Sequence, residues 1–214
     1  MVTLYTWLPP SAETIFEQAL QPDVGHSALE VKGPDGNTRV YASFWPECDS
    51  LIGKIRELWK ERPCRHPSSY EQDSDPDGAY MQRQADHADT IEGLSEDVIV
   101  DLWQLLQDSD YDFLRWNCSN VGKLLLLSAV EPKYLPDMEK AMCCTPDELL
   151  SISGADELLE KLRYLSTSAF LDCRPDDLRR AVQAYTTAKE NAESNVVVTQ
   201  PSPQAQDETF VKRS

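Results

Sequence analysis

The stretch Tyr111–Leu126, YDFLRWNCSNVGKLLL, decides the fold because it places Cys118 where a loop becomes a helix. The sequence predicts that this helix runs from about Asn117 to Val130. A helix N-terminus carries unpaired N–H groups and a partial positive charge, which favour a thiolate over a thiol. The same N–H groups can stabilise a developing oxyanion. The stretch therefore predicts a reactive cysteine at the start of a helix.

The second informative stretch, Val24–Val31 (VGHSALEV), places His26 near the start of a predicted strand. The turn signal Gly33–Asn37 follows, and Thr38–Trp45 predicts a return strand, so the two strands form a hairpin. An imidazole beside a thiol can take the thiol proton and return it to a leaving amine. His26 and Cys118 are therefore candidates for base and nucleophile. Each also has a structural interpretation, as a hydrogen-bonded strand histidine and as a small buried core residue.

Other elements surround the hairpin. Residues 2–8 predict a first strand, and residues 63–80 lack apolar periodicity and predict a long surface loop. Ser95 precedes a predicted helix whose buried face comprises Val98, Ile99, Leu102, Trp103, Leu105 and Leu106. The remaining predicted helices cover 11–20, 50–61, a segment starting at the capping box Thr145–Glu148, 155–165 and 175–190.

Together these elements predict an α+β fold. A small antiparallel sheet packs on the helix that carries Cys118, and a helical region follows. We expect a catalytic domain over 1–130 and a helical extension over 131–190 packed on it. The composition from Asn191 onward predicts a disordered tail over 191–214.

The chain is strongly acidic. Its 214 residues include 20 Lys and Arg against 37 Asp and Glu, which gives a net charge of −17 and a pI near 4.5. The segment 63–101 alone holds ten acidic and two basic residues. Such a surface repels nucleic-acid phosphates and anionic lipids, and it attracts basic proteins. We therefore expect a peptide or protein substrate and no nucleic-acid partner. A protein inhibitor or another protein partner is a further candidate.

The sequence also predicts where the protein resides. Its longest apolar run, Leu124–Val130, is far shorter than the roughly 20 residues that span a bilayer, so we expect no transmembrane segment. The first eight residues lack the basic region of a secretory signal peptide. We expect a protein made in the cytoplasm, and its delivery to another cell would need a secretion system independent of signal peptides. The six cysteines show no paired framework, so we expect reduced thiols.

Three stretches, VGHSALEV (24–31), RVYASFWP (39–46) and YDFLRWNCSNVGKLLL (111–126), resemble in this order the circularly permuted papain-like thiol enzymes. In those enzymes the histidine strand precedes the cysteine helix. The likeness covers about residues 22–130 and is greatest to a module of bacterial effector and toxin proteins. More remote likenesses are to PPPDE-type deubiquitinating peptidases, to the lecithin–retinol acyltransferase group and, in unpermuted order, to NlpC-type cell-wall amidases.

The resemblance implies that Cys118 is the nucleophile and His26 the base. The acyltransferase group has a second histidine on the return strand, and Thr38–Trp45 contains none. With the turn centred near Asp35, the position facing His26 falls close to Phe44. Ser43 is then the nearest polar candidate for an orienting residue, with Glu47 and Asp49 as substitutes just past the strand. The residues flanking the pair, Asn117, Trp116 and Trp45, are candidates for an oxyanion site or the wall of a substrate cleft.

One acidic stretch has a metal-binding interpretation. Asp73, Asp75 and Asp77 occupy positions 1, 3 and 5 of a calcium-loop pattern, with Gly78 at position 6. Position 12 is Gln84, where such loops have a bidentate glutamate. We therefore predict a solvated acidic loop, no metal and no cofactor.

Three functions follow from these patterns. The first is a cysteine hydrolase of the peptidase, amidase or isopeptidase type, working through a thioacyl intermediate on Cys118. The second is a thiol acyltransferase that passes a fatty acyl group to a lysine or a lipid. The third is a catalytically silent binding module on the same fold.

Overall fold

The structure, a computed structural model, describes residues 1–8, 25–47, 63–111, 117–142 and 174–198. The predicted helices at 11–20, at 50–61, at Thr145 and at 155–165 lie outside these ranges. The described elements, in chain order, are β1 (Val2–Trp7), β2 (His26–Lys32), β3 (Thr38–Ser43), β4 (Trp45–Pro46), β5 (Cys64–Arg65), α3 (Tyr70–Ser74), β6 (His87–Ile91), α4 (Glu96–Leu106), α5 (Cys118–Ala129), the 3₁₀ turn η1 (Pro132–Tyr134), α6 (Leu135–Met142) and α9 (Pro175–Val198).

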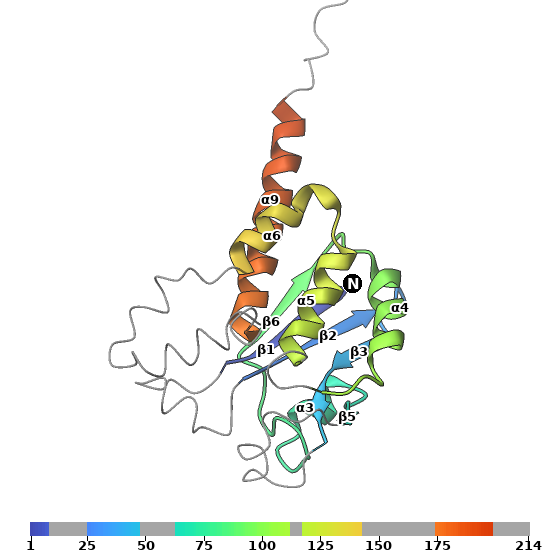
Figure 1. The fold of residues 1–214 in the computed structure, drawn as a ribbon. Helices are drawn as coiled ribbons and strands as arrows, with labels where there is room; N and C mark the ends of the chain where they lie inside the picture. Colours follow the sequence, from blue (N-terminus) through green and yellow to red (C-terminus); the bar gives the residue numbers. More distant parts are fainter. Residues whose placement is uncertain (9–24, 48–62, 112–116, 143–173, 199–214) are drawn as a thin grey trace, which may run out of the picture.

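The main sheet has four antiparallel strands in the order β3-β2-β1-β6 (Figure 1). The two short strands β4 and β5 pair separately. Helices α4, α5 and α9 contact the strands of the sheet, and α6 packs along α9. The predicted α+β class, with a small antiparallel sheet and a C-terminal helical region, is confirmed.

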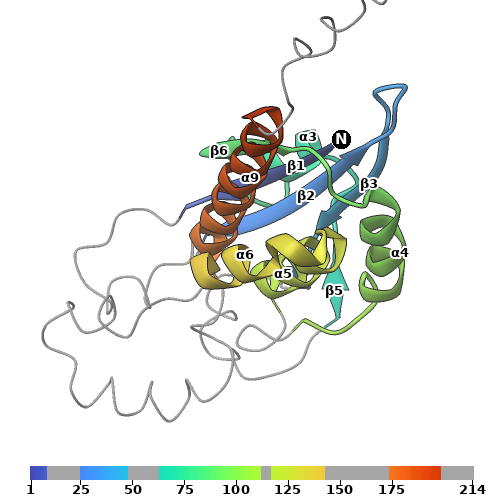
Figure 2. The ribbon, with the colours of Figure 1, turned by 90° about the horizontal axis from the view of Figure 1, so that it is seen from above.

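The sheet separates two layers. Successive side chains of a strand point to opposite faces, so Val2 and Leu4 of β1 join the core formed with the helices, whereas Tyr5 and Trp7 pack on the other face. Figure 2 shows α4, α5, α6 and α9 on one side of the sheet and α3 on the other. The second face carries its own small cluster, in which Trp7 packs near Tyr70 of α3. It is this second face that leads to His26.

The hairpin register differs by one residue from the predicted one. A register shift between Val31 and Lys32 inserts an extra residue next to the turn, and beyond it Ala28 lies opposite Ser43. Extending this register places Trp45 opposite His26, where the sequence predicted Phe44. The two rings indeed stack, with centroids 4.1 Å apart.

The acidic segment after the hairpin contains more structure than predicted. The expected long loop over 63–80 includes β5 and the single helical turn α3, in which Asp73 and Ser74 are buried. Strand β6 was not predicted, because HADTI holds only one strongly apolar residue, Ile91. It forms because β1 offers an unpaired edge, and Ile91 lies opposite Val2 in the pairing.

Two predictions about the helices need correction, one on the buried face of α4 and one on the end of α9. Leu105 of α4 is 76% exposed, because the buried face follows Ile99 and Trp103, and Leu105 lies about 200° around the helix from Trp103. The disordered tail expected from Asn191 does not begin there, since α9 continues to Val198. The helix starts on the sheet and extends beyond it (Figure 1).

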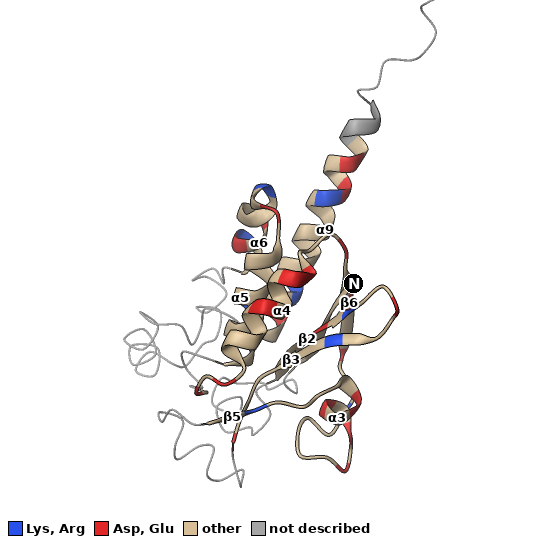
Figure 3. Cartoon of the chain, turned by 90° about the vertical axis from the view of Figure 1, so that its right-hand side faces the viewer, with Lys and Arg blue, Asp and Glu red and all other residues tan. Residues whose placement is uncertain are grey.

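Charge is spread over the described surface. Figure 3 shows acidic residues along α4, and Arg39 of β3 forms ion pairs with Asp97 and Glu96 of that helix. Among the described residues, no helix has both the length and the apolar composition needed to cross a bilayer.

Candidate active site

Cys118 is the first residue of α5, and its position depends on Asn117. The Asn117 side chain caps the helix by accepting hydrogen bonds at 3.0 Å from the amides of Ser119 and Asn120. The Cys118 side chain is thereby held at the positive end of the helix dipole. The residue is 9% exposed, so its sulfur sits at the edge of the core.

His26 opens β2 and is held between aromatic rings. Its imidazole stacks on Trp45 at 4.1 Å and lies 5.3 Å from the Trp7 ring, measured between centroids. The side chain is 1% exposed. Each of His26 and Cys118 shifts the pKa of the other, so the two side chains face each other, and His26 Nε2 lies 2.9 Å from Ser43 Oγ. Because Nε2 faces Ser43, the other ring nitrogen, Nδ1, is left for Cys118.

A buried carboxylate completes the cluster. Asp73 of α3 is fully buried, and its Oδ2 atom accepts hydrogen bonds from Ser43 Oγ at 2.7 Å and from the Tyr41 hydroxyl at 3.0 Å. Its Oδ1 atom lies 3.2 Å from Trp45 Nε1. His26 Nε2 is 3.5 Å from Oδ2. The structure therefore places Cys118, His26, Ser43 and Asp73 in one continuous row.

The electrostatics favour an ionised row. Burial opposes a charged imidazole, but the negative charges of Cys118 and Asp73 beside it outweigh burial and raise the pKa of His26 to about 9. Burial also opposes a thiolate, yet the charge of His26, its hydrogen bond and the Ser27 amide lower the pKa of Cys118. The pKa of Asp73 is lowered despite its burial, because His26, Ser43 and Tyr41 all favour the carboxylate. All three shifts favour the charged forms, a thiolate, an imidazolium and a carboxylate, over the neutral ones.

The start of α5 also offers an oxyanion donor. The Asn117 cap uses the amides of Ser119 and Asn120, and the amide of Val121 donates to the Asn117 carbonyl. Within the described part of the chain, the Cys118 amide has no hydrogen-bond partner. It is therefore available to a negatively charged oxygen beside the sulfur.

The structure does not bring every sequence-predicted site residue together. Ser43 and Trp45 lie against His26, and Asn117 caps the cysteine helix. Glu47 is exposed, and its amide pairs with the Pro63 carbonyl in the β4–β5 bridge. Asp49 and Trp116 lie outside the described residues.

Asp73 is buried, although the acidic pattern of Asp73, Asp75 and Asp77 predicted a solvated loop. Its carboxylate points at the sheet, whereas the exposed Asp75 accepts a hydrogen bond from the Asp77 amide within the turn. The three carboxylates therefore do not converge as calcium ligands would. Among the described residues, no group of three or more His, Cys, Asp or Glu side chains is arranged to hold a metal.

One sequence signal pointed toward Asp73. Tyr41, Ser43 and Trp45 alternate along the return strand, so their three polar hydrogens lie on one face of the sheet. Buried donors of this kind need an acceptor. The hairpin offers Glu30, which pairs with Tyr41 across the strands but accepts from Tyr5 and Thr38. The sequence could therefore have indicated that these donors need an acidic partner, but not that the partner is Asp73.

Comparisons of the chain with models of known protein families, with curated proteins and with solved structures find no match. The function must therefore be argued from the geometry of this site.

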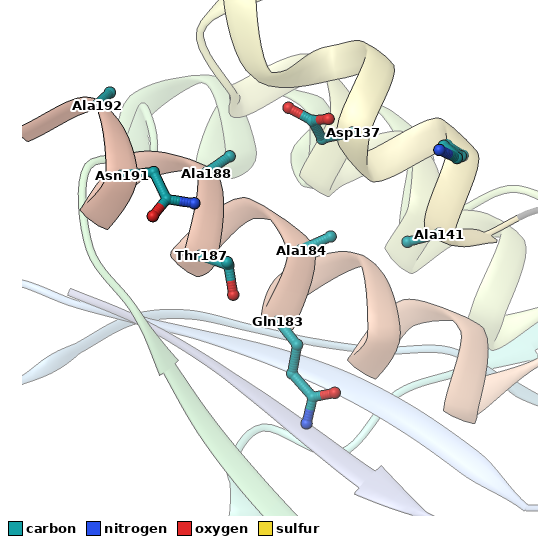
Figure 4. Close-up of a pocket in the computed structure, with 9 residues that line it drawn as sticks. Asp137, Ala141, Gln183, Ala184, Thr187, Ala188, Asn191 and Ala192 are labelled. Atoms are coloured by element: carbon teal, nitrogen blue, oxygen red, sulfur yellow. The ribbon is translucent and has the colours of Figure 1, made fainter. Parts of the chain in front are cut away.

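A hollow elsewhere on the molecule is separate from this row. A groove of about 820 Å³ lies between α6 and α9, and Figure 4 shows the residues that line it. Its lining residues are Asp137, Lys140, Ala141, Gln183, Ala184, Thr187, Ala188, Asn191 and Ala192. None of them belongs to β2, β3, α3 or α5, so the groove does not lead to Cys118.

Proposed function

We propose that the protein is a cysteine hydrolase that cleaves an amide or isopeptide bond through a thioacyl intermediate on Cys118. One observation carries this proposal: the buried His26 ring lies beside Cys118, whose pKa it lowers, and also contacts Ser43 and Asp73. The order along the chain, histidine strand before cysteine helix, is that of the permuted papain-like enzymes that the sequence resembles. Membership of that group is part of the proposal.

In the first half of the reaction, the Cys118 thiolate attacks the carbonyl carbon of a peptide or protein substrate. A C–S bond forms, and the carbonyl oxygen becomes an oxyanion that the Cys118 amide can stabilise. The oxyanion collapses and the C–N bond breaks. The leaving nitrogen takes the proton from His26 Nδ1, so an amine departs and a thioester remains.

In the second half, neutral His26 takes a proton from a water molecule while the water oxygen attacks the thioester. The C–S bond breaks, and the products are a carboxylic acid and the thiolate beside a recharged imidazolium. The carboxylate of Asp73 stabilises the positive ring in both halves, which is its expected electrostatic role in such a row.

The reactivity of Cys118 can be tested without a substrate. At pH 7, iodoacetamide should modify Cys118 faster than the other five cysteines, because alkylation needs a thiolate. Cys64 is a matched internal control, since burial raises the pKa of its thiol. Mass mapping of the full chain against time gives the six rates. Equal rates at Cys118 and Cys64 would contradict the assigned nucleophile.

The role of His26 needs a variant. His26→Ala should slow alkylation and any turnover, with turnover falling by two to four orders of magnitude, the usual contribution of a general acid or base. His87→Ala is the control, because His87 lies on the edge strand β6 and outside the row. A folded and fully active His26→Ala variant would overturn the assignment.

The product distinguishes the three functions. The full chain and a Cys118→Ala control are incubated with a peptide mixture or with a fatty acyl-CoA, and intact masses are recorded. New peptide fragments that depend on Cys118 support the hydrolase. A fatty acyl adduct on Cys118 that passes to an amine indicates an acyltransferase, and unchanged masses throughout indicate a binding module.

A further inference from the structure

The hydroxyl of Ser43 stands between the base and the carboxylate. It is 2.9 Å from His26 Nε2 and 2.7 Å from Asp73 Oδ2, whereas the direct separation of Nε2 and Oδ2 is 3.5 Å. Hydrogen bonds of N–H to oxygen are normally 2.7–3.2 Å long. The direct separation is longer than a normal hydrogen bond, so the hydrogen-bonded connection from His26 to Asp73 passes through Ser43.

The hydrogens at Ser43 can be counted. A hydroxyl has one hydrogen to donate and two lone pairs that accept. Ionised Asp73 only accepts, so the Ser43 hydrogen goes to Asp73. Trp45 Nε1 has a single hydrogen, shared between Ser43 Oγ at 3.1 Å and Asp73 Oδ1 at 3.2 Å, so it uses at most one lone pair of Oγ. The second lone pair then accepts from His26, which requires a hydrogen on Nε2.

The packing around His26 prevents its imidazole ring from flipping, so Nδ1 and Nε2 cannot swap positions. Trp45 stacks on one side of the ring at 4.1 Å, Trp7 packs nearby at 5.3 Å, and the whole side chain is 1% exposed. A rotation of the ring would also break its contacts with Ser43 and Cys118. The aromatic neighbours and the hydroxyl thus specify the same orientation.

We propose that Ser43 is a positioning residue that links His26 to Asp73, fixes the hydrogen of the neutral ring on Nε2 and keeps Nδ1 for Cys118. The role of Ser43 in catalysis rests on the proposed function, whereas the contacts of Ser43 do not depend on any substrate. The charge of Asp73 reaches the imidazolium through a polarised hydroxyl in a site without bulk water, where such chains are stronger than in solution. Tyr41 and Trp45 hold Asp73 in place for this link.

The first measurement uses the unaltered full chain. In ¹⁵N-labelled protein at pH 10, above the titration of His26, long-range ¹H–¹⁵N spectra report which ring nitrogen carries the hydrogen. His66→Ala and His87→Ala spectra assign the signals, because the chain has three histidines. We expect hydrogen on Nε2. Hydrogen on Nδ1 would overturn the proposal without any variant at Ser43.

The second measurement is the pH dependence of Cys118 alkylation in Ser43→Ala, Ser43→Thr and Asp73→Asn. We expect Ser43→Ala to shift the profile toward higher pH and to slow alkylation at pH 6 about tenfold, corresponding to one pH unit. Ser43→Thr keeps the hydroxyl and should restore most of the rate. Ser74→Ala is the matched control, since it removes a buried hydroxyl from α3 that donates to the Tyr70 carbonyl and accepts from Gln84, outside the row.

The outcomes separate the two proposals. A wild-type profile in which Cys118 titrates like an ordinary thiol contradicts the proposed catalytic pair. A shifted wild-type profile that Ser43→Ala leaves unchanged, while Asp73→Asn moves it, shows that Asp73 acts on His26 directly and overturns the role of Ser43. A loss in Ser43→Ala that Ser43→Thr does not restore also overturns it.

Discussion

Cys118, His26 and Asp73 are three buried groups that ionise in the same small volume. Isolated buried charges are costly, so each must be compensated by the others and by hydrogen bonds. Removal of one partner leaves an uncompensated charge, at a cost of roughly 3–5 kcal/mol. Variants that keep shape while removing charge, such as Asp73→Asn, are therefore better probes of this row than truncations.

The two opposed pKa shifts predict the pH dependence of turnover. The proposed hydrolysis would need the Cys118 thiolate and the His26 imidazolium together. The rate should rise with pH as the thiol, whose pKa is lowered, ionises, and it should fall as pH passes about 9 and His26 loses its proton. A bell-shaped profile of kcat/KM against pH, measured on a cleaved peptide, would show both limbs. Activity that continues to rise through pH 10 would contradict the role of His26 as the acid.

At the level of elements, the start of α5 determines how the cysteine is presented. Asn117→Ala removes the acceptor of two amide hydrogen bonds and should lower the free energy of unfolding by about 1 kcal/mol. Asn117→Asp keeps the acceptor and should keep the stability, because an acidic group suits a helix N-terminus. Its negative charge should nevertheless raise the pKa of Cys118 and slow alkylation at pH 7. Urea unfolding and alkylation rates test the two variants, and equal effects of both would refute this account.

The crossing of α5 and α9 supplies a second prediction at this scale. A Cβ atom added at Gly122 would lie 2.8 Å from Leu178 Cδ1, and Leu178 is fully buried. Gly122→Ala should therefore destabilise the protein by about 1 kcal/mol, since overpacking costs roughly 1–3 kcal/mol and the gain in helix propensity offsets up to about 1. In a Leu178→Ala background the same change should become neutral or stabilising. A double-mutant cycle from urea unfolding measures this coupling, and additive effects would contradict it.

The elements show how much of the fold the sequence could predict. Strand β1, the hairpin, α4 and α5 were predicted because each carries its own periodicity or turn signal. Strand β6 was missed because its structure depends on pairing with β1, and α3 because a single turn has too few residues to show a period. Leu105 was assigned to the wrong face because two apolar stripes of α4 are compatible with its sequence.

The residues of the candidate site also differ in how far the sequence could predict them. Cys118 and His26 stand at local landmarks, a helix start and a strand start, and Ser43 follows from the hairpin register. Asp73 is 30 residues from Ser43 along the chain, and only the packing of α3 on the sheet brings them together. Its acidic neighbours made a solvated loop the natural interpretation. A contact between distant segments leaves no periodic signal in a single sequence.

At the scale of the whole molecule, the ion pair links folding to pH. Stability rises with pH where the unfolded chain binds more protons than the folded one, and falls where it binds fewer. The raised pKa of His26 contributes stability that is complete below about 6.5, the unperturbed value, and is lost as pH rises through about 9. The lowered pKa of Cys118 contributes stability that is complete above about 8.5 and is lost as pH falls through the lowered value. Between about 6.5 and 8.5 the two slopes oppose each other.

The row should therefore give a plateau of stability near neutral pH with a decline on both sides. The other charges of this acidic chain also depend on pH, so the contribution of the row must be isolated by difference. We expect the free energy of unfolding of the wild-type chain, minus that of a His26→Gln, Cys118→Ala double variant, to be constant between about pH 6.5 and 8.5. The difference should fall as pH rises from about 8.5 through 9, where the folded chain binds more protons than the unfolded chain because only folded His26 remains charged. It should also fall as pH drops below about 6.5, where the folded chain binds fewer protons because Cys118 remains a thiolate only in the folded chain. Urea unfolding of both proteins from pH 5 to 10 provides the curve. A difference that does not change with pH over that range would mean that Cys118 and His26 are not an ion pair in the folded protein.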